Sequence, residues 1–84
     1  MTDQEILATF TRILRDLLAD DSVVLGMDTI RDDVPGWDSF KYITFIVSAE
    51  MELGIKFRIA DVESFQTVGD IVTEAQALLK GKGH

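Results

Sequence analysis

The chain has 84 residues, 46% of them hydrophobic, which is enough for one small domain with a modest core. Fifteen acidic residues against eight basic ones give a formal charge of −7, and such a surface repels nucleic acid and anionic lipid while attracting basic partner surfaces. The absence of cysteine excludes disulfides, thiolate metal sites and a thiol nucleophile supplied by the protein itself.

The start of the chain, Met1–Glu5, is acidic where a secretory signal would be basic. No apolar run is long enough to cross a membrane. We therefore expect a monomeric cytoplasmic protein without membrane insertion.

The first predicted element is an amphipathic helix over Asp3–Leu18, because apolar residues recur there at helical spacing on one face. Thr2 and Glu5 have the spacing of a capping box at its start.

Residues 19–37 show no sustained period and predict a long acidic loop, a kind of connection that is usually functional or disordered. Scattered apolar residues indicate a loop anchored across a helical core rather than a disordered one; they are Val23, Leu25, Met27, Ile30 and Val34. Asp28, Asp32 and Asp33 lack the spacing, central Gly and terminal Glu of a calcium-binding loop, so no metal site is predicted.

The second main helix is predicted over 39–53. Pro35-Gly36 breaks the backbone before it, Asp38 supplies a capping carboxylate, and Gly54 provides a stop. Ser39 therefore occupies the first helical position, where free N–H groups and the helix dipole favour a phosphate. On these residues alone, the simpler interpretation is that Asp38 and Ser39 only cap the helix.

This helix carries two apolar stripes. One consists of Tyr42, Phe45, Ile46, Ala49 and Leu53, and the other of Phe40, Ile43, Val47 and Met51. A small domain cannot easily bury a helix on every side, so we expect the first stripe in the core and the second at least partly exposed for a partner. The competing interpretation is that Phe40 and Met51 complete the core.

The remaining chain predicts an extended connector over 55–59, a short helical turn over 61–64 and a last helix capped by Thr67. Ile55, Phe57 and Ile59 are expected to point inward. Gly81 is expected to end the last helix, leaving residues 81–84 as a frayed tail. The chain thus reads as all-α: a long helix, a long acidic loop, a second helix, a connector with a short helical turn, and a last helix.

Catalytic chemistry is poorly supported by these residues. The only histidine is His84, at the end of the chain, so Ser39 has no evident base. A nucleophile elbow, a phosphate-binding Gly-rich loop and a Cys/His metal cluster are all missing. We predict no catalytic residues and no enzyme activity.

Three segments together resemble the acyl carrier protein family across essentially the whole chain. Asp38-Ser39-Phe40 is similar to the family's Asp-Ser-Leu, Glu50-Met51-Glu52-Leu53-Gly54-Ile55 continues the match, and Thr67-Val68-Gly69-Asp70 resembles the opening of the family's last helix. The resemblance implies an acyl carrier domain over residues 1–80, folded as a four-helix bundle of three main helices and a short third one, with a long loop between helices 1 and 2. It further implies 4′-phosphopantetheine attached covalently to Ser39, with Asp38 as motif residue and helix cap. It also implies a phosphopantetheinyl transferase and acyl-loading and acyl-using enzymes as partners.

The second helix departs from the pattern of bacterial fatty acid synthesis carriers, which have a strongly acidic helix there. Lys41 and Thr44 stand where acids are usual. We therefore expect a specialised carrier for a fatty acid, lipid or polyketide pathway, with a partner-binding surface formed by Phe40, Lys41, Ile43, Thr44, Val47 and Met51. The alternative is an unmodified helical interaction module that has a carrier-like fold.

Overall fold

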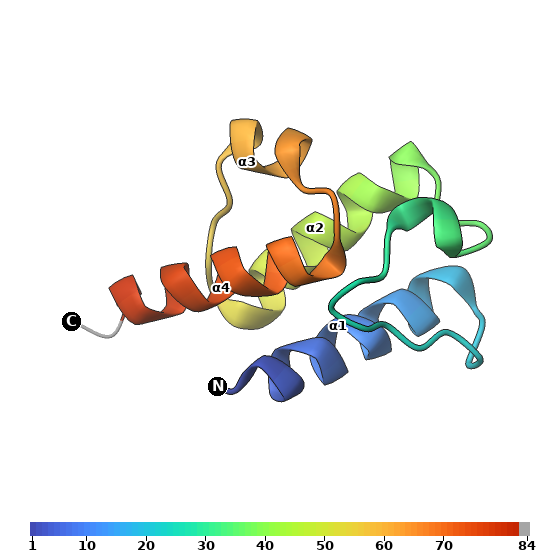
Figure 1. The fold of residues 1–84 in the computed structure, drawn as a ribbon, viewed down its shortest axis with the longest axis horizontal. Helices are drawn as coiled ribbons and strands as arrows, with labels where there is room; N and C mark the ends of the chain where they lie inside the picture. Colours follow the sequence, from blue (N-terminus) through green and yellow to red (C-terminus); the bar gives the residue numbers. More distant parts are fainter. Residues whose placement is uncertain (83–84) are drawn as a thin grey trace.

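The computed structural model describes residues 1–82, and all of its regular elements are helical. They are α1 (Asp3–Leu18), the 3₁₀ turn η1 (Arg31–Asp33), α2 (Ser39–Leu53), α3 (Ile59–Ser64) and α4 (Val68–Lys82). The predicted all-α bundle of three main helices and a short third one is confirmed. In Figure 1, α1, α2 and α4 lie together, and α3 lies to one side of them. Along the chain, α3 connects the end of α2 to the start of α4.

The predicted caps of α1 and α2 are present. Thr2 and Glu5 form a capping box, with the Glu5 N–H donating to the Thr2 hydroxyl and the Thr2 N–H to the Glu5 carboxylate. The Asp38 carboxylate accepts from the Lys41 N–H at 2.9 Å, and Gly54 ends α2 in the left-handed conformation at φ 67°.

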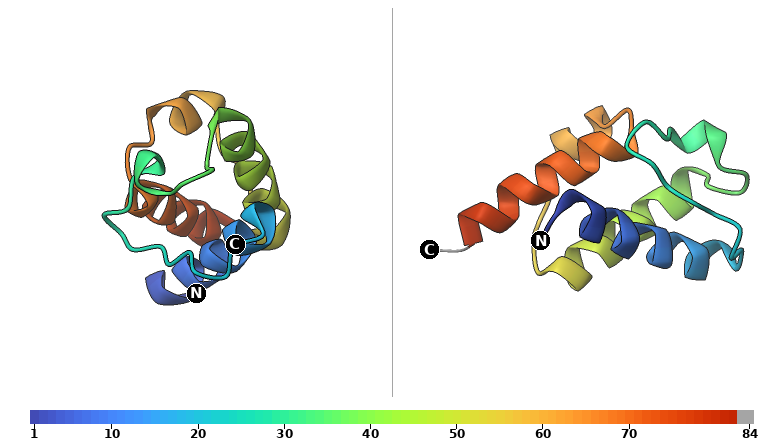
Figure 2. Two further views of the ribbon diagram at one scale, coloured as in Figure 1. Left: turned by 90° about the vertical axis from the view of Figure 1, so that its right-hand side faces the viewer. Right: turned by 60° about the horizontal axis from the view of Figure 1, so that its bottom comes forward.

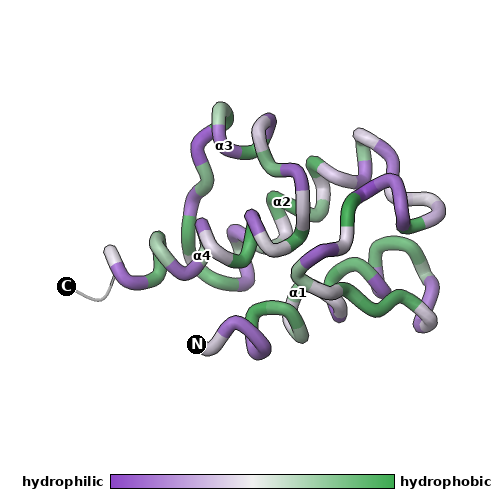
Figure 3. Tube along the Cα trace, viewed as in Figure 1, coloured by the Kyte–Doolittle hydropathy of each residue, from purple (hydrophilic) through white to green (hydrophobic). Residues whose placement is uncertain are grey.

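The core is built on a row of aromatic rings. Phe10 of α1 and Trp37 each meet Phe45 of α2 edge to face, with ring centroids 5.3 and 5.1 Å apart. Tyr42 lies beside Trp37 at 6.1 Å. Figure 3 shows that polar and apolar residues alternate along the helices, as amphipathic packing requires.

The long loop is fixed to the core rather than free, as its apolar residues predicted. Val23 and Leu25 are buried. Its backbone also accepts hydrogen bonds from the start of α4: the Val68 N–H donates to the Thr29 carbonyl and the Gly69 N–H to the Met27 carbonyl, both at 2.8 Å. Figure 2 shows the loop running beside α1 and α4.

Two predictions about the C-terminal half are wrong. Ile59 does not point inward: it is 77% exposed, because α3 begins at Ile59 rather than at Asp61 and turns that side chain outward. Gly81 does not end the last helix, since α4 continues to Lys82. The rest of the predicted frayed tail, residues 83–84, lies outside the described part of the chain.

No helix among the described residues is both long enough and apolar enough to cross a membrane.

Candidate functional site

The turn before α2 sets the position of Ser39. The Trp37 N–H donates to the Val34 carbonyl at 3.2 Å, and Gly36 between them has φ 85°, the conformation that a type II turn needs at its third residue. Pro35 suits the preceding position of such a turn. The turn directs the Trp37 ring into the core and leaves Asp38 and Ser39 exposed at the helix start.

Ser39 lies at the first position of α2 with its side chain exposed. The Asp38 carboxylate occupies the Lys41 N–H, and the Tyr42 N–H donates to the Asp38 carbonyl. Within the described part of the chain, the N–H groups of Ser39 and Phe40 donate to no protein acceptor. These two donors lie at the positive end of a 15-residue helix, an arrangement that favours an anion next to the Ser39 hydroxyl.

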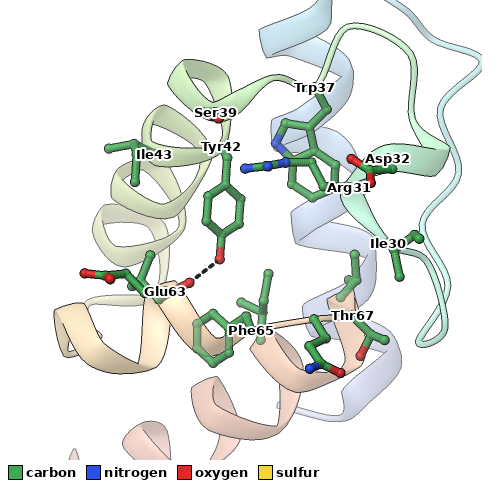
Figure 4. Close-up of a pocket in the computed structure, with 14 residues that line it drawn as sticks. Ile30, Arg31, Asp32, Trp37, Ser39, Tyr42, Ile43, Glu63, Phe65 and Thr67 are labelled. Carbon is green, nitrogen blue, oxygen red and sulfur yellow. Dashed lines mark hydrogen bonds between the residues drawn. The ribbon is translucent and has the colours of Figure 1, made fainter.

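A cavity of about 680 Å³ opens beside Ser39, between α2, α3, the start of α4 and η1 (Figure 4). The side chains of Tyr42, Val62 and Phe65 line it together with Trp37 and Arg31. Tyr42 spans the cavity, since its hydroxyl donates to the Val62 carbonyl at 2.7 Å and ties α2 to α3.

Two polar groups that line this cavity, the Trp37 indole N–H and the Arg31 guanidinium, lie next to aromatic rings instead of hydrogen-bond acceptors. Trp37 is only 5% exposed, and its indole Nε1 is the one buried side-chain polar atom of the described residues without a hydrogen-bond partner. The Arg31 guanidinium lies 5.3 Å from the centre of the Tyr42 ring, a cation–π distance. Burial raises the pKa of the Tyr42 hydroxyl, and the nearby Arg31 charge opposes that rise.

The predicted partner surface is exposed along α2. Phe40 and Met51 are each 80% exposed, and Ile43 and Val47 lie between them with about half of their surface accessible. The interpretation that Phe40 and Met51 complete the core is therefore wrong. The opposite stripe packs inside, with Phe45, Ile46 and Ala49 buried and Tyr42 and Leu53 partly buried, as predicted.

The other predicted surface residues, Lys41 and Thr44, lie on the same helix and are partly buried. The Thr44 hydroxyl donates to the Phe40 carbonyl one turn earlier. Among the described residues, no group of three or more carboxylate or histidine side chains is arranged to hold a metal ion.

No family model and no curated protein matches the sequence. Among solved structures, the chain is similar to the solution NMR structure of a holo acyl carrier protein from Geobacter metallireducens. The two share 33% sequence identity over 94% of this chain and 93% of that one, with a TM-score of 0.83. The chain belongs to the acyl carrier protein family.

Two of the motifs that resemble acyl carrier proteins have clear structural roles here. Trp37, ahead of Asp38-Ser39, is a core residue and a wall of the cavity. In Thr67-Val68-Gly69-Asp70, Gly69 lets α4 approach the loop backbone: a Cβ on Gly69 would lie 2.6 Å from the Met27 carbonyl oxygen.

Sequence reasoning missed the roles of Arg31, Val62 and Gly69. The sequence does not indicate which aromatic ring the Arg31 side chain contacts. It also cannot indicate that the Val62 carbonyl accepts a hydrogen bond, because every residue has a carbonyl group. The glycine was detectable, since a glycine inside a predicted helix often marks a close backbone approach.

Proposed function

We propose that this chain carries acyl groups as thioesters on a 4′-phosphopantetheine group attached to Ser39, and that it presents them to partner enzymes without being an enzyme itself. The observation that carries the proposal is the exposed Ser39 hydroxyl at the start of α2, beside two unpaired N–H groups and the mouth of a cavity. Family membership supports the same function.

The residues at this site fit the proposed group. The Ser39 hydroxyl is accessible for attachment, and the N–H groups of Ser39 and Phe40 suit a phosphodiester. The cavity beside Ser39 has a volume in the range of small-molecule sites and holds an unpaired buried donor on Trp37. When bound, phosphopantetheine supplies the thiol that the cysteine-free chain lacks.

In this proposal an external enzyme carries out the attachment, as the resemblance to acyl carrier proteins implies. In the proposed reaction, the Ser39 hydroxyl loses its proton to a phosphopantetheinyl transferase and bonds to the phosphorus of coenzyme A that bears pantetheine. The bond from that phosphorus to the adenosine nucleotide breaks, and the nucleotide leaves with the electron pair. Magnesium belongs to the transferase in this scheme.

The partner surface proposed for enzyme docking consists of Phe40, Lys41, Ile43, Thr44, Val47 and Met51. Its centre is an exposed apolar stripe, a composition typical of partner sites. The acids that remain on α2 have structural tasks: Glu50 accepts from the Phe57 N–H at 2.7 Å, and Glu52 pairs with Arg12 of α1. We therefore propose docking through apolar area more than through acidic charge, and a specialised rather than a housekeeping pathway.

The carrier function is tested by loading. After treatment with transferase and coenzyme A, the wild-type protein should accept an acyl group that neutral hydroxylamine releases, as expected of a thioester. Ser39→Ala should accept none, while Ser48→Ala on the same helix should load normally. Hydroxylamine-resistant loading, or loading of Ser39→Ala, would contradict the proposal.

The specialisation is tested by a charge substitution on the partner surface. Lys41→Glu combined with Thr44→Glu should improve use of the loaded protein by a housekeeping fatty acid synthase, because basic enzyme surfaces attract an acidic helix. The measurement is the rate of acyl transfer at low and high salt. Full activity of the unaltered protein in that system would refute the specialisation and leave an ordinary fatty acid carrier.

A further inference from the structure

Two hydrogen-bond donors in the cavity beside Ser39 have no acceptor. The Trp37 indole N–H is buried and unpaired. The Arg31 guanidinium contacts the face of the Tyr42 ring and makes no hydrogen bond or ion pair within residues 1–82. In Figure 4 the indole nitrogen and the guanidinium lie on the same side of the cavity, next to the Tyr42 ring.

This arrangement is complementary to an acceptor. A buried N–H without a partner loses its hydration and gains nothing in return, so each such group in a folded protein requires an explanation. Here both donors belong to the wall of one cavity, and Ser39 lies at the same cavity. A ligand oxygen reaching in from Ser39 would satisfy the indole and give the guanidinium a hydrogen bond.

The charges around the cavity indicate an uncharged acceptor. Asp32 and Glu63 line it together with Arg31, so a carboxylate ligand would meet two like charges. A carbonyl oxygen accepts hydrogen bonds from both donors without that repulsion. The lining also includes the apolar side chains of Val62, Phe65 and Ile71, which suit an alkyl segment.

We propose that the Trp37 indole N–H and the Arg31 guanidinium bind an uncharged carbonyl oxygen of the group carried on Ser39. This inference rests on the proposed function. The oxygen comes either from an amide of the phosphopantetheine arm or from a 3-oxo group on the acyl chain. In the second case the pair selects oxygen-bearing cargo over plain alkyl cargo.

The single tryptophan of the chain makes the test direct, because the protein has one indole N–H resonance in a ¹H–¹⁵N spectrum. Spectra are recorded for the unmodified protein, the phosphopantetheine form, the hexanoyl form and the 3-oxohexanoyl form. A downfield shift of the indole proton, with nuclear Overhauser contacts to arm protons in the phosphopantetheine form, identifies the arm amide as the acceptor. A shift and contacts that arise only with 3-oxohexanoyl identify the cargo oxygen.

Two variants separate binding from structure. Arg31→Met removes the guanidinium but keeps a long side chain, and should reduce the indole shift on loading and the gain in melting temperature that loading gives. Trp37→Phe removes the indole N–H together with part of a core ring, so its loaded form is compared with its own unmodified form, and the gain on loading should be smaller than that of the wild-type protein. Arg58→Met is the matched control, because Arg58 pairs with Asp61 on α3 and does not line the cavity.

The proposal is overturned if the indole resonance is the same in all four forms, or if it shifts without any contact to arm or cargo protons, as a phosphate or water acceptor would give. The intact mass distinguishes this failure from failure of the proposed function. A protein that gains phosphopantetheine but keeps its indole resonance loses only this inference, whereas a protein that never gains the mass contradicts both.

Discussion

Gly69 lies where the long loop and the last helix are in close contact. Its N–H donates to the Met27 carbonyl, and a Cβ at this position would be 2.6 Å from that oxygen, inside any normal contact distance. The neighbour is backbone, which cannot rotate away. The packing at this point therefore requires glycine for space, although its φ is not in the left-handed region.

Gly69→Ala should lower the free energy of unfolding by about 1 to 3 kcal/mol, as overpacking against a fixed group does. Gly81→Ala, on the same helix, is the matched control: its Cβ would meet nothing within 4 Å, so alanine should raise stability by up to about 1 kcal/mol through helix propensity. Urea denaturation monitored by circular dichroism measures both. Equal effects of the two substitutions would show that the close approach is not rigid.

Asp70 holds the start of α4 and should make stability depend on pH. The N–H groups of Gln66 and Thr67 donate to its carboxylate at 2.9 and 3.1 Å, and these hydrogen bonds lower its pKa. A carboxyl whose pKa is lower in the folded state stabilises the fold above its unfolded value, and this contribution is lost as pH falls through the folded value.

The free energy of unfolding of the wild-type protein should therefore fall as the pH drops below the ordinary Asp pKa of about 3.9. In Asp70→Asn, which has no carboxyl group at this position, the free energy of unfolding should fall less over the same pH range. Thermal unfolding at a series of acidic pH values provides the comparison. The Glu74 side chain, on the same helix, forms no hydrogen bond or ion pair among residues 1–82, so Glu74→Gln serves as the control. If Asp70→Asn leaves the pH dependence of stability unchanged, Asp70 does not contribute to the loss of stability in acid.

At the scale of elements, α2 faces both the core and the surroundings. Phe45 is fully buried and contacts two other aromatic rings, whereas Phe40 and Met51 are 80% exposed on the other side of the helix. The same residue type, Phe, is therefore packed in the core at one position of α2 and exposed at another.

Phe40→Ala and Met51→Ala should each change the free energy of unfolding by no more than about 0.5 kcal/mol, because neither side chain is packed. They should weaken binding to a cognate enzyme, by about 2 kcal/mol if either is an anchor. Phe45→Ala is the contrasting variant and should cost about 3 to 5 kcal/mol of stability. A large loss of stability in Phe40→Ala would show that it packs in solution.

The elements could be predicted largely because their signals are local. The ends of α2 follow from Asp38 and Gly54, and the two stripes follow from helical spacing. The prediction for Ile59 was wrong because an alternating run resembles an inward-pointing extended segment, whereas α3 begins at that residue, with the Val62 N–H donating to the Arg58 carbonyl. The cavity could not be predicted, because the positions of Arg31, Trp37 and Tyr42 relative to one another depend on tertiary structure. The turn at Gly36 and the hydrogen bond from the Tyr42 hydroxyl to the Val62 carbonyl set these positions.

At the scale of the whole molecule, the excess of acidic charge opposes the compact state. The net charge is −7, and the exposed loop acids Asp28, Asp32 and Asp33 form no ion pair among the described residues. Like charges repel one another, and this repulsion destabilises a compact state. These three carboxylates lie in the loop that precedes Ser39.

The melting temperature should therefore rise with moderate NaCl and more steeply with millimolar magnesium or calcium. Asp32→Asn combined with Asp33→Asn should raise the melting temperature at low salt and reduce its dependence on salt. Differential scanning calorimetry across a salt series tests both statements. A melting temperature that is indifferent to salt and to divalent ions would reject self-repulsion as a significant destabilising effect.

The central claim is that Ser39 bears the phosphopantetheine group, and the intact mass of the protein after incubation with a broad-specificity transferase and coenzyme A tests it most directly. The wild-type protein and Ser48→Ala should each gain the mass of one phosphopantetheine group. Ser39→Ala should remain folded and gain none. Modification of Ser39→Ala, or no gain by the wild-type protein, would contradict the account, and the second result would favour an unmodified interaction module.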